Sequence, residues 1–305
     1  MQKAYIEALF ALAQADASIL SIAADNGTDY DWLFQRDLPE QFLNVGISEQ
    51  NMVAVAAGLS TTGFIPFVTT AGAFMVYRAY EFIRDDICLG KRNVKMFASG
   101  SGMSISNLGP THHTTEDVAL LRTLPNLTVF SPATPSELKR AVNEAYRITG
   151  PVYIRAGMSG ERDDLVTFDR LDKACCVVEG CEAALCVSGS IVHEAVQAAA
   201  RLKASGINAG VYHFAQLMPF DAETVERLAD EAKLIVTLEE HSRFGGLGGL
   251  VAEVLAERSK HAPLMRLGLE GFACGYGTQA EMRKQNHLSA DDVFQAVWSK
   301  MGGKA

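Results

Sequence analysis

Short apolar segments alternate with helix-like segments along almost the whole chain, and this alternation restricts the fold more than any other feature. The apolar segments are continuous, as is typical of strands buried on both faces of a parallel sheet. The candidate strands of the first half are residues 19–25, 41–47, 65–70, 94–100, 127–133 and 151–157. The helix-like segments around them are residues 2–15, 49–61, 74–88, 115–123 and 135–148. This order predicts an α/β fold in which helices cover both faces of a parallel sheet.

A polar, charged segment at residues 158–173 interrupts this order, and a second series of strands and helices follows it. The later candidate strands are residues 183–190, 208–214, 233–240 and 264–270, and the candidate helices are 191–204, 221–232 and 247–259. We therefore expect two α/β domains, residues 1–165 and a smaller one at 181–305, joined by a linker at residues 166–180.

Composition and charge exclude several classes of partner. The 305 residues carry a net charge of −9, which argues against nucleic acid or an anionic membrane as the main partner. No apolar run approaches the roughly 18 residues of a membrane span, and the N-terminus lacks the layout of a signal peptide. The six cysteines include no CxxC pair and fit a reducing compartment, so we expect a cytoplasmic protein.

Glu49 stands at a corner between a candidate strand and a candidate helix, in the segment NVGISEQNMVAVAAG at residues 44–58. The simple interpretation is a helix start, with Ser48 as N-cap and an acid that gains ~0.3–1 kcal/mol from the helix dipole. However, ligands of open parallel sheets bind beyond the carboxyl ends of the strands. Glu49, residues 69–74 and the loop at 99–113 each follow a candidate strand, so all three are expected at one edge of the sheet.

Other motifs taken singly do not decide the function. The loop at residues 99–113 is longer than most connections in a compact domain, and such loops are often functional. No glycine-rich nucleotide-binding motif is present. An aromatic stripe at Phe74, Tyr77 and Tyr80 is more often core than a cofactor platform. The segment LEEHSRFGGLGG, residues 238–249, is most simply a tight strand-to-helix connection with solvated charges, and a role for His241 stays open.

The combination of motifs is more specific than any one of them. The segments GISEQNMVAVAAGL, PFVTTAGAFMVYRAYEFIRDDI, GPTHHTTEDVALLRTLPNLTVFSPATPSE and GPVYIRAG occur in this order. Together they resemble the pyrimidine-binding domain of the transketolase family. Residues 177–305, with LEEHSRFGGLGG, resemble the transketolase C-terminal domain, so the resemblance covers nearly the whole chain. It implies a parallel-sheet pyrimidine-binding domain, a smaller α/β C-terminal domain, and thiamine diphosphate as cofactor.

The resemblance also implies roles for individual residues. Glu49 would hydrogen-bond a ring nitrogen of the cofactor's aminopyrimidine and so favour the form whose exocyclic nitrogen removes the thiazolium C2 proton. Phe74 would stack on that ring, with Tyr77 one turn further along at the edge of the pocket. His112 would lie beside the aminopyrimidine and the substrate carbonyl, where imidazole suits proton transfer and orientation. Adjacent side chains in an extended chain cannot both point the same way, which argues against a metal site at His112 and His113. His113 would simply face outward, and whether it has a function stays open.

A family feature that is missing from the chain points to a partner. Transketolases hold the cofactor's diphosphate through Mg²⁺ (or Ca²⁺) with a GDG motif, and no GDG occurs in these 305 residues. The chain also begins where the pyrimidine-binding domain would begin. We therefore expect that this chain contains no metal ligands. We also expect that it is one subunit of a split transketolase. A separate N-terminal subunit would carry the diphosphate-binding domain, most simply in an α2β2 heterotetramer.

The substrate end departs from the common family pattern as well. Leu108 stands where ordinary transketolases carry an Asp that reads a donor hydroxyl. An Arg, a Ser and a His that grip the sugar phosphate map near Gln2, Asp29 and Gly100, and only Arg155 matches a phosphate-site arginine. The expected substrates are therefore modified sugars or sugar phosphates, unless the partner supplies the missing contacts.

The resulting expectation is a transferase of aldehyde or ketone groups that is active only with its partner subunit. It would move a two-carbon ketol unit from a ketose to an aldose. Two alternatives stay open: the β subunit of a 2-oxoacid dehydrogenase or synthase, which releases CO₂, and a non-catalytic regulatory homologue.

Overall fold

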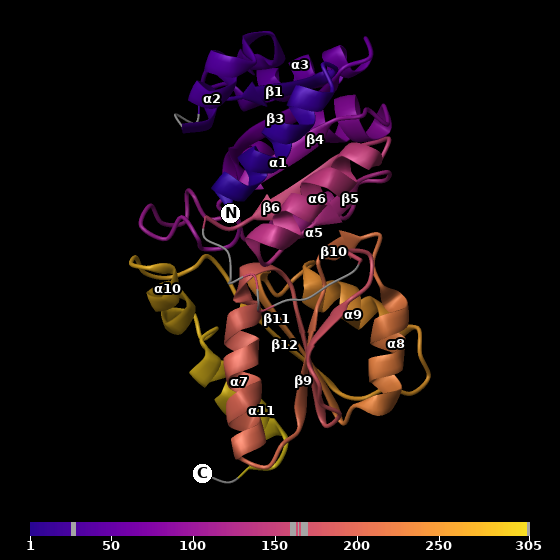
Figure 1. The fold of residues 1–305 in the computed structure, drawn as a ribbon. Helices are drawn as coiled ribbons and strands as arrows, with labels where there is room; N and C mark the ends of the chain where they lie inside the picture. Colours follow the sequence, from indigo (N-terminus) through magenta and orange to yellow (C-terminus); the bar gives the residue numbers. More distant parts are fainter. Residues whose placement is uncertain (26–28, 159–162, 164, 166–169, 304–305) are drawn as a thin grey trace.

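A computed structural model describes residues 1–25, 29–158, 163, 165 and 170–303, and it contains two α/β units stacked end to end (Figure 1). The first unit is built on a seven-stranded sheet with the order β10-β5-β6-β4-β3-β1-β2. Its strands from the first half of the chain are β1 (Ile19–Ala23), β2 (Phe42–Asn44), β3 (Ile65–Ala71), β4 (Lys95–Ser99), β5 (Thr128–Phe130) and β6 (Val152–Ala156). All pairings among these six strands are parallel, as expected for this domain.

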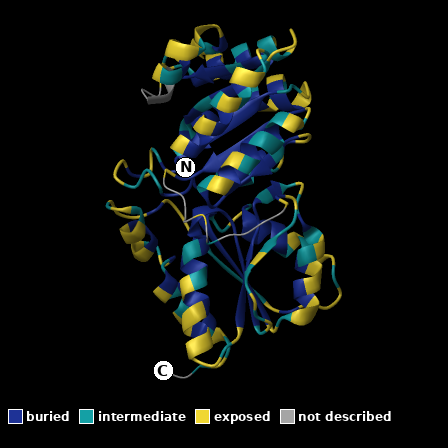
Figure 2. Ribbon diagram, in the orientation of Figure 1, coloured by how far each residue is buried: buried dark blue, intermediate teal, exposed yellow. Residues whose placement is uncertain are grey.

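Helices cover both faces of this sheet because successive residues of a strand point to opposite faces, and both sets of side chains are apolar. On β3, Phe67 packs with α1 (Gln2–Ala15) and α6 (Pro135–Arg147), whereas Val68 belongs to the core beneath α3 (Glu49–Ser60). The remaining helical elements are α2 (Asp29–Asp37), the 3₁₀ turn Pro39–Gln41, α4 (Ala79–Phe82) between two π-helical segments (Phe74–Arg78 and Ile83–Leu89), and α5 (Asp117–Leu121). Figure 2 shows the buried strands between partly exposed helices.

The second unit has a five-stranded sheet with the order β12-β11-β8-β9-β7. Its strands are β7 (Cys175–Val178), β8 (Ala183–Val187), β9 (Ala209–His213), β11 (Leu234–Ser242) and β12 (Leu264–Leu269). Its helical elements are the 3₁₀ turn Gly189–Ile191, α7 (Val192–Ala204), α8 (Ala222–Glu231), α9 (Leu247–Ala256), α10 (Gln279–Gln285) and α11 (Ala290–Lys300). Helix α7 packs against α11, and α8 packs against α9. The predicted two-domain α/β fold is confirmed.

Two strands make the sheets mixed rather than purely parallel. β7 pairs antiparallel with β9, and β10 (Gln216–Met218) pairs antiparallel with β5. β10 therefore adds residues of the second half of the chain to the sheet of the first unit. Of the predicted linker at 166–180, residues 166–169 lie outside the described residues and 175–178 form β7. The proposed domain limits stay a prediction.

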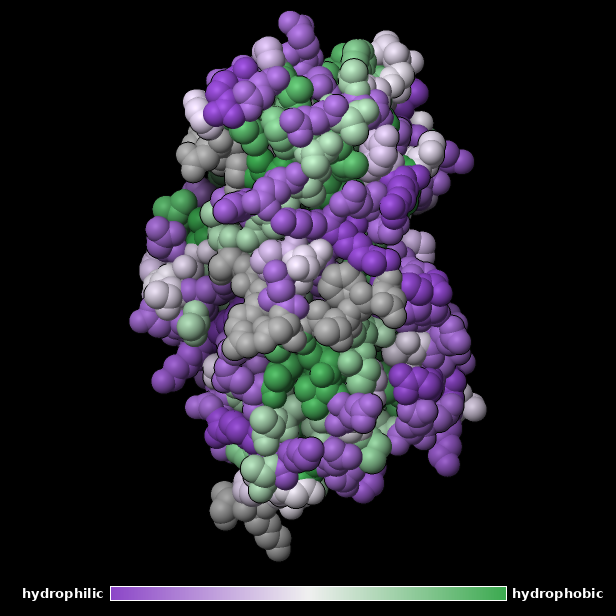
Figure 3. All heavy atoms as spheres, in the orientation of Figure 1, coloured by the Kyte–Doolittle hydropathy of each residue, from purple (hydrophilic) through white to green (hydrophobic). Residues whose placement is uncertain are grey.

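The surface agrees with this layered arrangement. On the side drawn in Figure 3, hydrophilic residues cover most of the outward surface and hydrophobic ones gather in smaller areas between them. Within the part of the chain that the structure describes, no helix is both long and apolar enough to cross a bilayer.

Candidate active site

Glu49 is the first residue of α3, and its side chain is only 2% exposed. The helix-start interpretation does not explain this burial. Ser48 occupies the N-cap position without capping through its side chain, because its hydroxyl instead donates to the carbonyl of Val45 over 2.9 Å. The Glu49 carboxylate accepts a 2.7 Å hydrogen bond at Oε2 from Nη1 of Arg78. A buried carboxylate needs such a partner to offset its desolvation.

Phe74 and His112 complete a contiguous set with this ion pair. The Arg78 guanidinium lies over the Phe74 ring, 4.9 Å from its centroid. The rings of Phe74 and His112 meet edge to face, with centroids 5.2 Å apart and an interplanar angle of 74°. The structure thus brings together Glu49, Phe74 and His112, which the sequence analysis proposed from three separate segments. Phe74–Arg78 is π-helical, a local widening of the helix that is frequent at functional sites.

Tyr77 connects this π-helical segment to the segment that follows His112. Its hydroxyl donates a 2.6 Å hydrogen bond to Oε2 of Glu116. It also accepts hydrogen bonds of 3.0 Å from the backbone N–H groups of Thr115 and Glu116. Burial, together with the nearby Asp117 charge, raises the pKa of Tyr77 above its ordinary value, so the hydroxyl stays a donor. The contacts of its hydroxyl are with residues 115–116, and its predicted place at the pocket edge stays a prediction.

The two adjacent histidines face opposite environments, but His113 is the buried one. His112 is half-buried, its backbone N–H donates to Gly109 over 3.0 Å, and its Nδ1 lies 3.0 Å from Oγ1 of Thr111. His113 is 2% exposed, and neither of its ring nitrogens has a hydrogen-bond partner among the described residues. Desolvation lowers the pKa of His113. The expectation that His113 faces outward is therefore wrong.

The proposed substrate residues differ in how far the structure supports them. Leu108 is 51% exposed and precedes Gly109, which has a φ of +75° and whose missing side chain leaves room for the Tyr276 ring of the second unit. Gly100 follows β4 with a φ of +81°, and a side chain there would collide with Ile105, so the glycine is explained by local packing. Asp29 begins α2, and its side chain lies outside the described residues, so its role stays a prediction.

Arg155 occupies an environment that its predicted role as a phosphate ligand does not fit. Its side chain is 5% exposed on β6, and its Nε donates to Oδ2 of the fully buried Asp117 over 2.9 Å. The hydroxyl of Tyr153 donates to the same oxygen over 2.8 Å, and Nη2 of Arg155 reaches the carbonyl of Thr114 at 3.4 Å. Because the guanidinium is buried and already paired with a carboxylate, we assign Arg155 a structural role instead.

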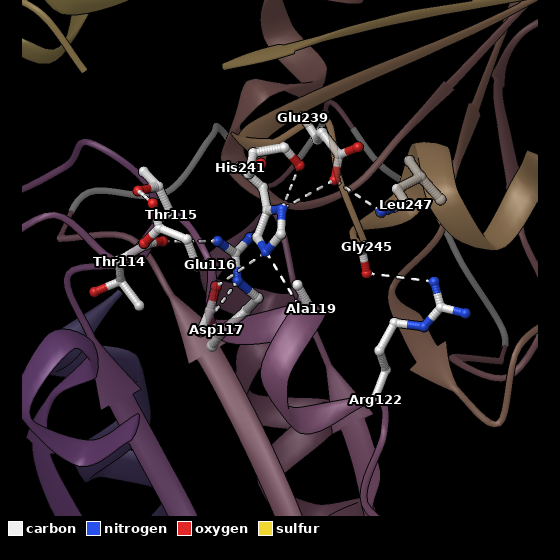
Figure 4. A network of polar contacts seen from close by, with 12 residues as sticks. Thr114, Thr115, Glu116, Asp117, Ala119, Arg122, Glu239, His241, Gly245 and Leu247 are labelled. Carbon is white, nitrogen blue, oxygen red and sulfur yellow. Dashed lines mark hydrogen bonds and ion pairs between the residues drawn. The ribbon is translucent and has the colours of Figure 1, made fainter. Parts of the chain in front are cut away.

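Three ionisable side chains of LEEHSRFGGLGG are buried rather than solvated, which corrects the sequence interpretation for them. Glu239 is 3% exposed, Glu240 5% and His241 1%. Glu239 accepts the backbone N–H groups of Leu247 and Gly248 at 2.7 and 2.8 Å, so it caps the N-terminus of α9, and burial raises its pKa. Figure 4 shows His241 between this carboxylate and the segment of the first unit that contains Asp117 and Ala119.

Sequence reasoning missed three residues that shape this region. Arg78 follows Phe74 by one helical turn, so the sequence already placed a cation beside the proposed aromatic ring. This spacing could have indicated a cationic partner for Glu49. Asp117 heads the apolar stretch VALL, where an acid is unusual enough to suggest a buried partner. Tyr276 lies in the glycine-flanked triplet GYG of the second unit, and nothing local to it indicates that its ring packs on Gly109.

Comparisons with known proteins agree with this architecture. The family model described as the transketolase pyrimidine-binding domain matches residues 1–159, and that of the transketolase C-terminal domain matches residues 172–293. The chain belongs to the transketolase family. It is similar to a putative transketolase C-terminal section of Methanocaldococcus jannaschii, with 33% identity over 99% of this chain and 96% of that protein.

Two further transketolase relatives match over most of their length. One of the subunits of the apulose-4-phosphate transketolase of Actinobacillus succinogenes is 34% identical over 87% of this chain and 86% of that protein. A solved structure described as a split-gene transketolase, an inactive β4 tetramer, superposes with a TM-score of 0.89. It is 38% identical and covers 100% of this chain and 99% of that one.

Membership of the transketolase family implies dependence on thiamine diphosphate, and the site fits the cofactor's aminopyrimidine. A carboxylate at 2% exposure can share a proton with a ring nitrogen away from water, and the half-buried Phe74 ring beside it offers a stacking surface. Among the residues that the structure describes, no three His, Cys, Asp or Glu side chains are placed to hold a metal ion.

The structural role of Arg155 leads to a measurable expectation. Arg155→Met leaves the buried Asp117 carboxylate without its cation, and breaking such a pair lowers the free energy of unfolding by about 3–5 kcal/mol. Arg147→Met, which breaks an ion pair with Glu144 whose side chains are 69% and 31% exposed, changes it by less than about 1 kcal/mol. Urea denaturation of the two variants measures both. An Arg155→Met protein as stable as the wild type would contradict the assignment.

Proposed function

We propose that this chain is the pyrimidine-binding, catalytic subunit of a heteromeric transketolase that transfers a two-carbon ketol unit from a ketose to an aldose. One observation carries the proposal: the Glu49 carboxylate is buried at the sheet edge, in a contiguous set with Phe74 and His112. A non-catalytic homologue would have no need to keep a carboxylate desolvated beside an aromatic ring and an imidazole.

Each residue of the set has a distinct task in this proposal. Glu49 would hold the aminopyrimidine by sharing a proton with one of its ring nitrogens, and Arg78, which donates to Oε2, leaves the second carboxylate oxygen available for this. Phe74 provides the stacking surface. His112 orients the substrate carbonyl and moves a proton to or from its oxygen. Thiamine diphosphate, when bound, supplies the nucleophilic carbon that accepts the two-carbon unit.

A separate N-terminal subunit completes the enzyme in this proposal, in an α2β2 assembly. It carries the GDG motif, which is absent from these 305 residues, and holds the diphosphate through Mg²⁺ or Ca²⁺. The relative from Actinobacillus succinogenes is named as one subunit of its transketolase, which supports a split enzyme. Exposed apolar side chains around the site give a surface for a partner: Ile47 is 75% exposed, Tyr276 67% and Leu108 51%.

We place the enzyme in the cytoplasm because its cysteine pattern fits a reducing compartment.

The substrates proposed are modified sugars or sugar phosphates. Leu108 puts an apolar side chain where an Asp would bond a ketose hydroxyl. The burial of Arg155 removes the only predicted phosphate-binding arginine of this chain. The relative named for apulose 4-phosphate supports a substrate outside the common pentose phosphates.

The first expectation concerns Glu49. Glu49→Gln keeps the shape of the side chain and the assembly of the complex but cannot share the proton, so turnover falls by about a hundredfold or more. Exchange of the cofactor's C2 proton, followed by quenched-flow NMR in the two-subunit complex, measures the affected step. Glu81→Gln, at an exposed position of α4, is the matched control and stays at the wild-type rate. A C2 exchange rate of Glu49→Gln within about threefold of wild type would rule out the assigned role.

The second expectation concerns the partner. Because metal-bridged diphosphate contacts supply much of the affinity for the cofactor, the isolated chain binds thiamine diphosphate with a Kd weaker than about 10 μM even with Mg²⁺. Adding the N-terminal subunit restores tight binding and ketol transfer without release of CO₂. Isothermal titration and product analysis measure these outcomes. Sub-micromolar binding by the chain alone would contradict the split site, and CO₂ release would favour a 2-oxoacid dehydrogenase or synthase.

The third expectation concerns specificity. A buried hydroxyl left without a partner costs about 1–3 kcal/mol, or roughly tenfold to a hundredfold in kcat/KM. The complex therefore uses xylulose 5-phosphate with ribose 5-phosphate poorly compared with a branched, sulfonated or unphosphorylated ketose. Leu108→Asp raises kcat/KM for xylulose 5-phosphate by about tenfold, while Leu108→Asn, which lacks the charge, raises it less. Equal use of xylulose 5-phosphate and the best modified donor by the wild type would defeat the argument.

A further inference from the structure

The segment that carries His112 is held from the second domain by the end of β11. The backbone N–H of Ser242 donates to the carbonyl of Thr115 over 2.6 Å. The backbone N–H of Ala119 donates to Nε2 of His241 over 3.3 Å. His241 is 1% exposed, so these contacts lie in the interior between the two domains (Figure 4). The motif that contains His241 has no task in the proposed reaction, and its burial therefore needs another explanation.

The hydrogen bonds of His241 fix both the tautomer and the orientation of its ring. Nδ1 lies 2.6 Å from the carbonyl oxygen of Ser242, which can only accept, so Nδ1 carries the proton. Nε2 is then the acceptor that the N–H of Ala119 requires. Oδ1 of Asp117, which has no hydrogen-bond partner among the described residues, lies 3.9 Å from Nε2. An aliphatic side chain at position 241 would leave the part-buried N–H of Ala119 and the carbonyl of Ser242 without these partners.

The first domain holds the other side of the same segment. Thr114 exchanges two backbone hydrogen bonds of 2.9 Å with Gly102, and its carbonyl accepts from Arg155. The hydroxyl of Tyr77 accepts the N–H groups of Thr115 and Glu116. Residues 114–119 are therefore bonded from both domains, and His112 lies only two residues before this clamped stretch, against the Phe74 ring.

We propose that His241 is a positioning residue: by holding residues 115–119 it fixes His112 against Phe74, so that the C-terminal domain sets the geometry of the histidine that meets the substrate. The inference deepens the proposed function and rests on it for the role of His112. It assigns the C-terminal domain a task in ketol transfer beyond the roles that the proposed function gives to Glu49, Phe74 and His112.

Three variants separate this task from simple packing. His241→Leu fills the space and removes both hydrogen bonds. His241→Gln keeps an acceptor near the position of Nε2, because the Gln side-chain oxygen reaches about as far as that nitrogen. His261→Leu is the matched control, since exposed His261 also contacts the next carbonyl, that of Ala262, from Nδ1 at 2.8 Å but lies outside the site.

Hydrogen–deuterium exchange on the two-subunit complex tests the clamp without reference to activity. His241→Leu is expected to speed exchange in peptides covering residues 112–119 by about tenfold, the change that loss of one buried hydrogen bond produces. In His241→Leu, the exchange rates of peptides covering α3 are expected to stay within about twofold of wild type. The same is expected for all peptides of His241→Gln and His261→Leu. The proposal would be overturned if His241→Leu sped exchange throughout the chain, or if exchange at residues 112–119 stayed at the wild-type rate.

A double-mutant cycle with His112→Ala tests whether His241 acts through His112. His241→Leu is expected to lower kcat/KM about tenfold in the wild-type background but less than about twofold in the His112→Ala background. His241→Gln recovers most of the loss, and the affinity for thiamine diphosphate is unchanged. Equal losses in both backgrounds would overturn the inference. If His112→Ala alone has no effect, the proposed role of His112 is wrong, and the exchange data still decide whether His241 holds the segment.

Discussion

Asp117 is a carboxylate with no exposed surface, and its charge is compensated by Arg155 and Tyr153 of β6, which both donate to Oδ2. His241 of β11 in the second domain lies beside this cluster, 3.9 Å from Oδ1, and its Nε2 accepts the backbone N–H of Ala119. An unpaired buried carboxylate would cost several kcal/mol, so this set forms as a unit or not at all. Helix α5 begins at Asp117 and is too short to be stable alone. Its position, and that of the His112 segment before it, therefore depends on the buried charge.

The two domains are joined by backbone as well as by this polar cluster. β10 is only three residues long, yet it pairs with β5 and forms one edge of the first sheet. A short antiparallel edge strand adds little stability by itself, but together with the Asp117 cluster it links the domains at two separate places. The C-terminal domain is thus part of the frame on which the site is built, although Glu49 and Phe74 both belong to the first domain.

The sequence predicted those elements whose pattern is local. All ten candidate strands are present, because a continuous apolar run between turn residues identifies a buried strand wherever it pairs. Five elements were missed: β7, β10, α2, α10 and α11. β10 has too few residues to carry a period, and the charged sequence of α2 has no clear apolar face. For the candidate site, the sequence proposed Glu49, Phe74 and His112 from segments that each follow a strand, and the structure places the three in one contiguous set with Arg78. The sequence misjudged Arg155, His113 and the charges of residues 239–241, because burial of a polar group depends on which distant partner reaches it.

The two sides of the proposed site rest on different supports. Glu49 and Phe74 sit on α3 and the π-helical segment, which are anchored by fully buried neighbours such as Met52 and Met75 in the core of the first domain. Leu108 and His112 lie on a loop whose contacts come from both domains, including Tyr276 and the end of β11. In the proposed reaction, the cofactor side needs one fixed geometry, whereas the substrate side has to match the sugar that the enzyme uses. Separate supports allow the loop and the second domain to change with the substrate while the buried carboxylate keeps its place.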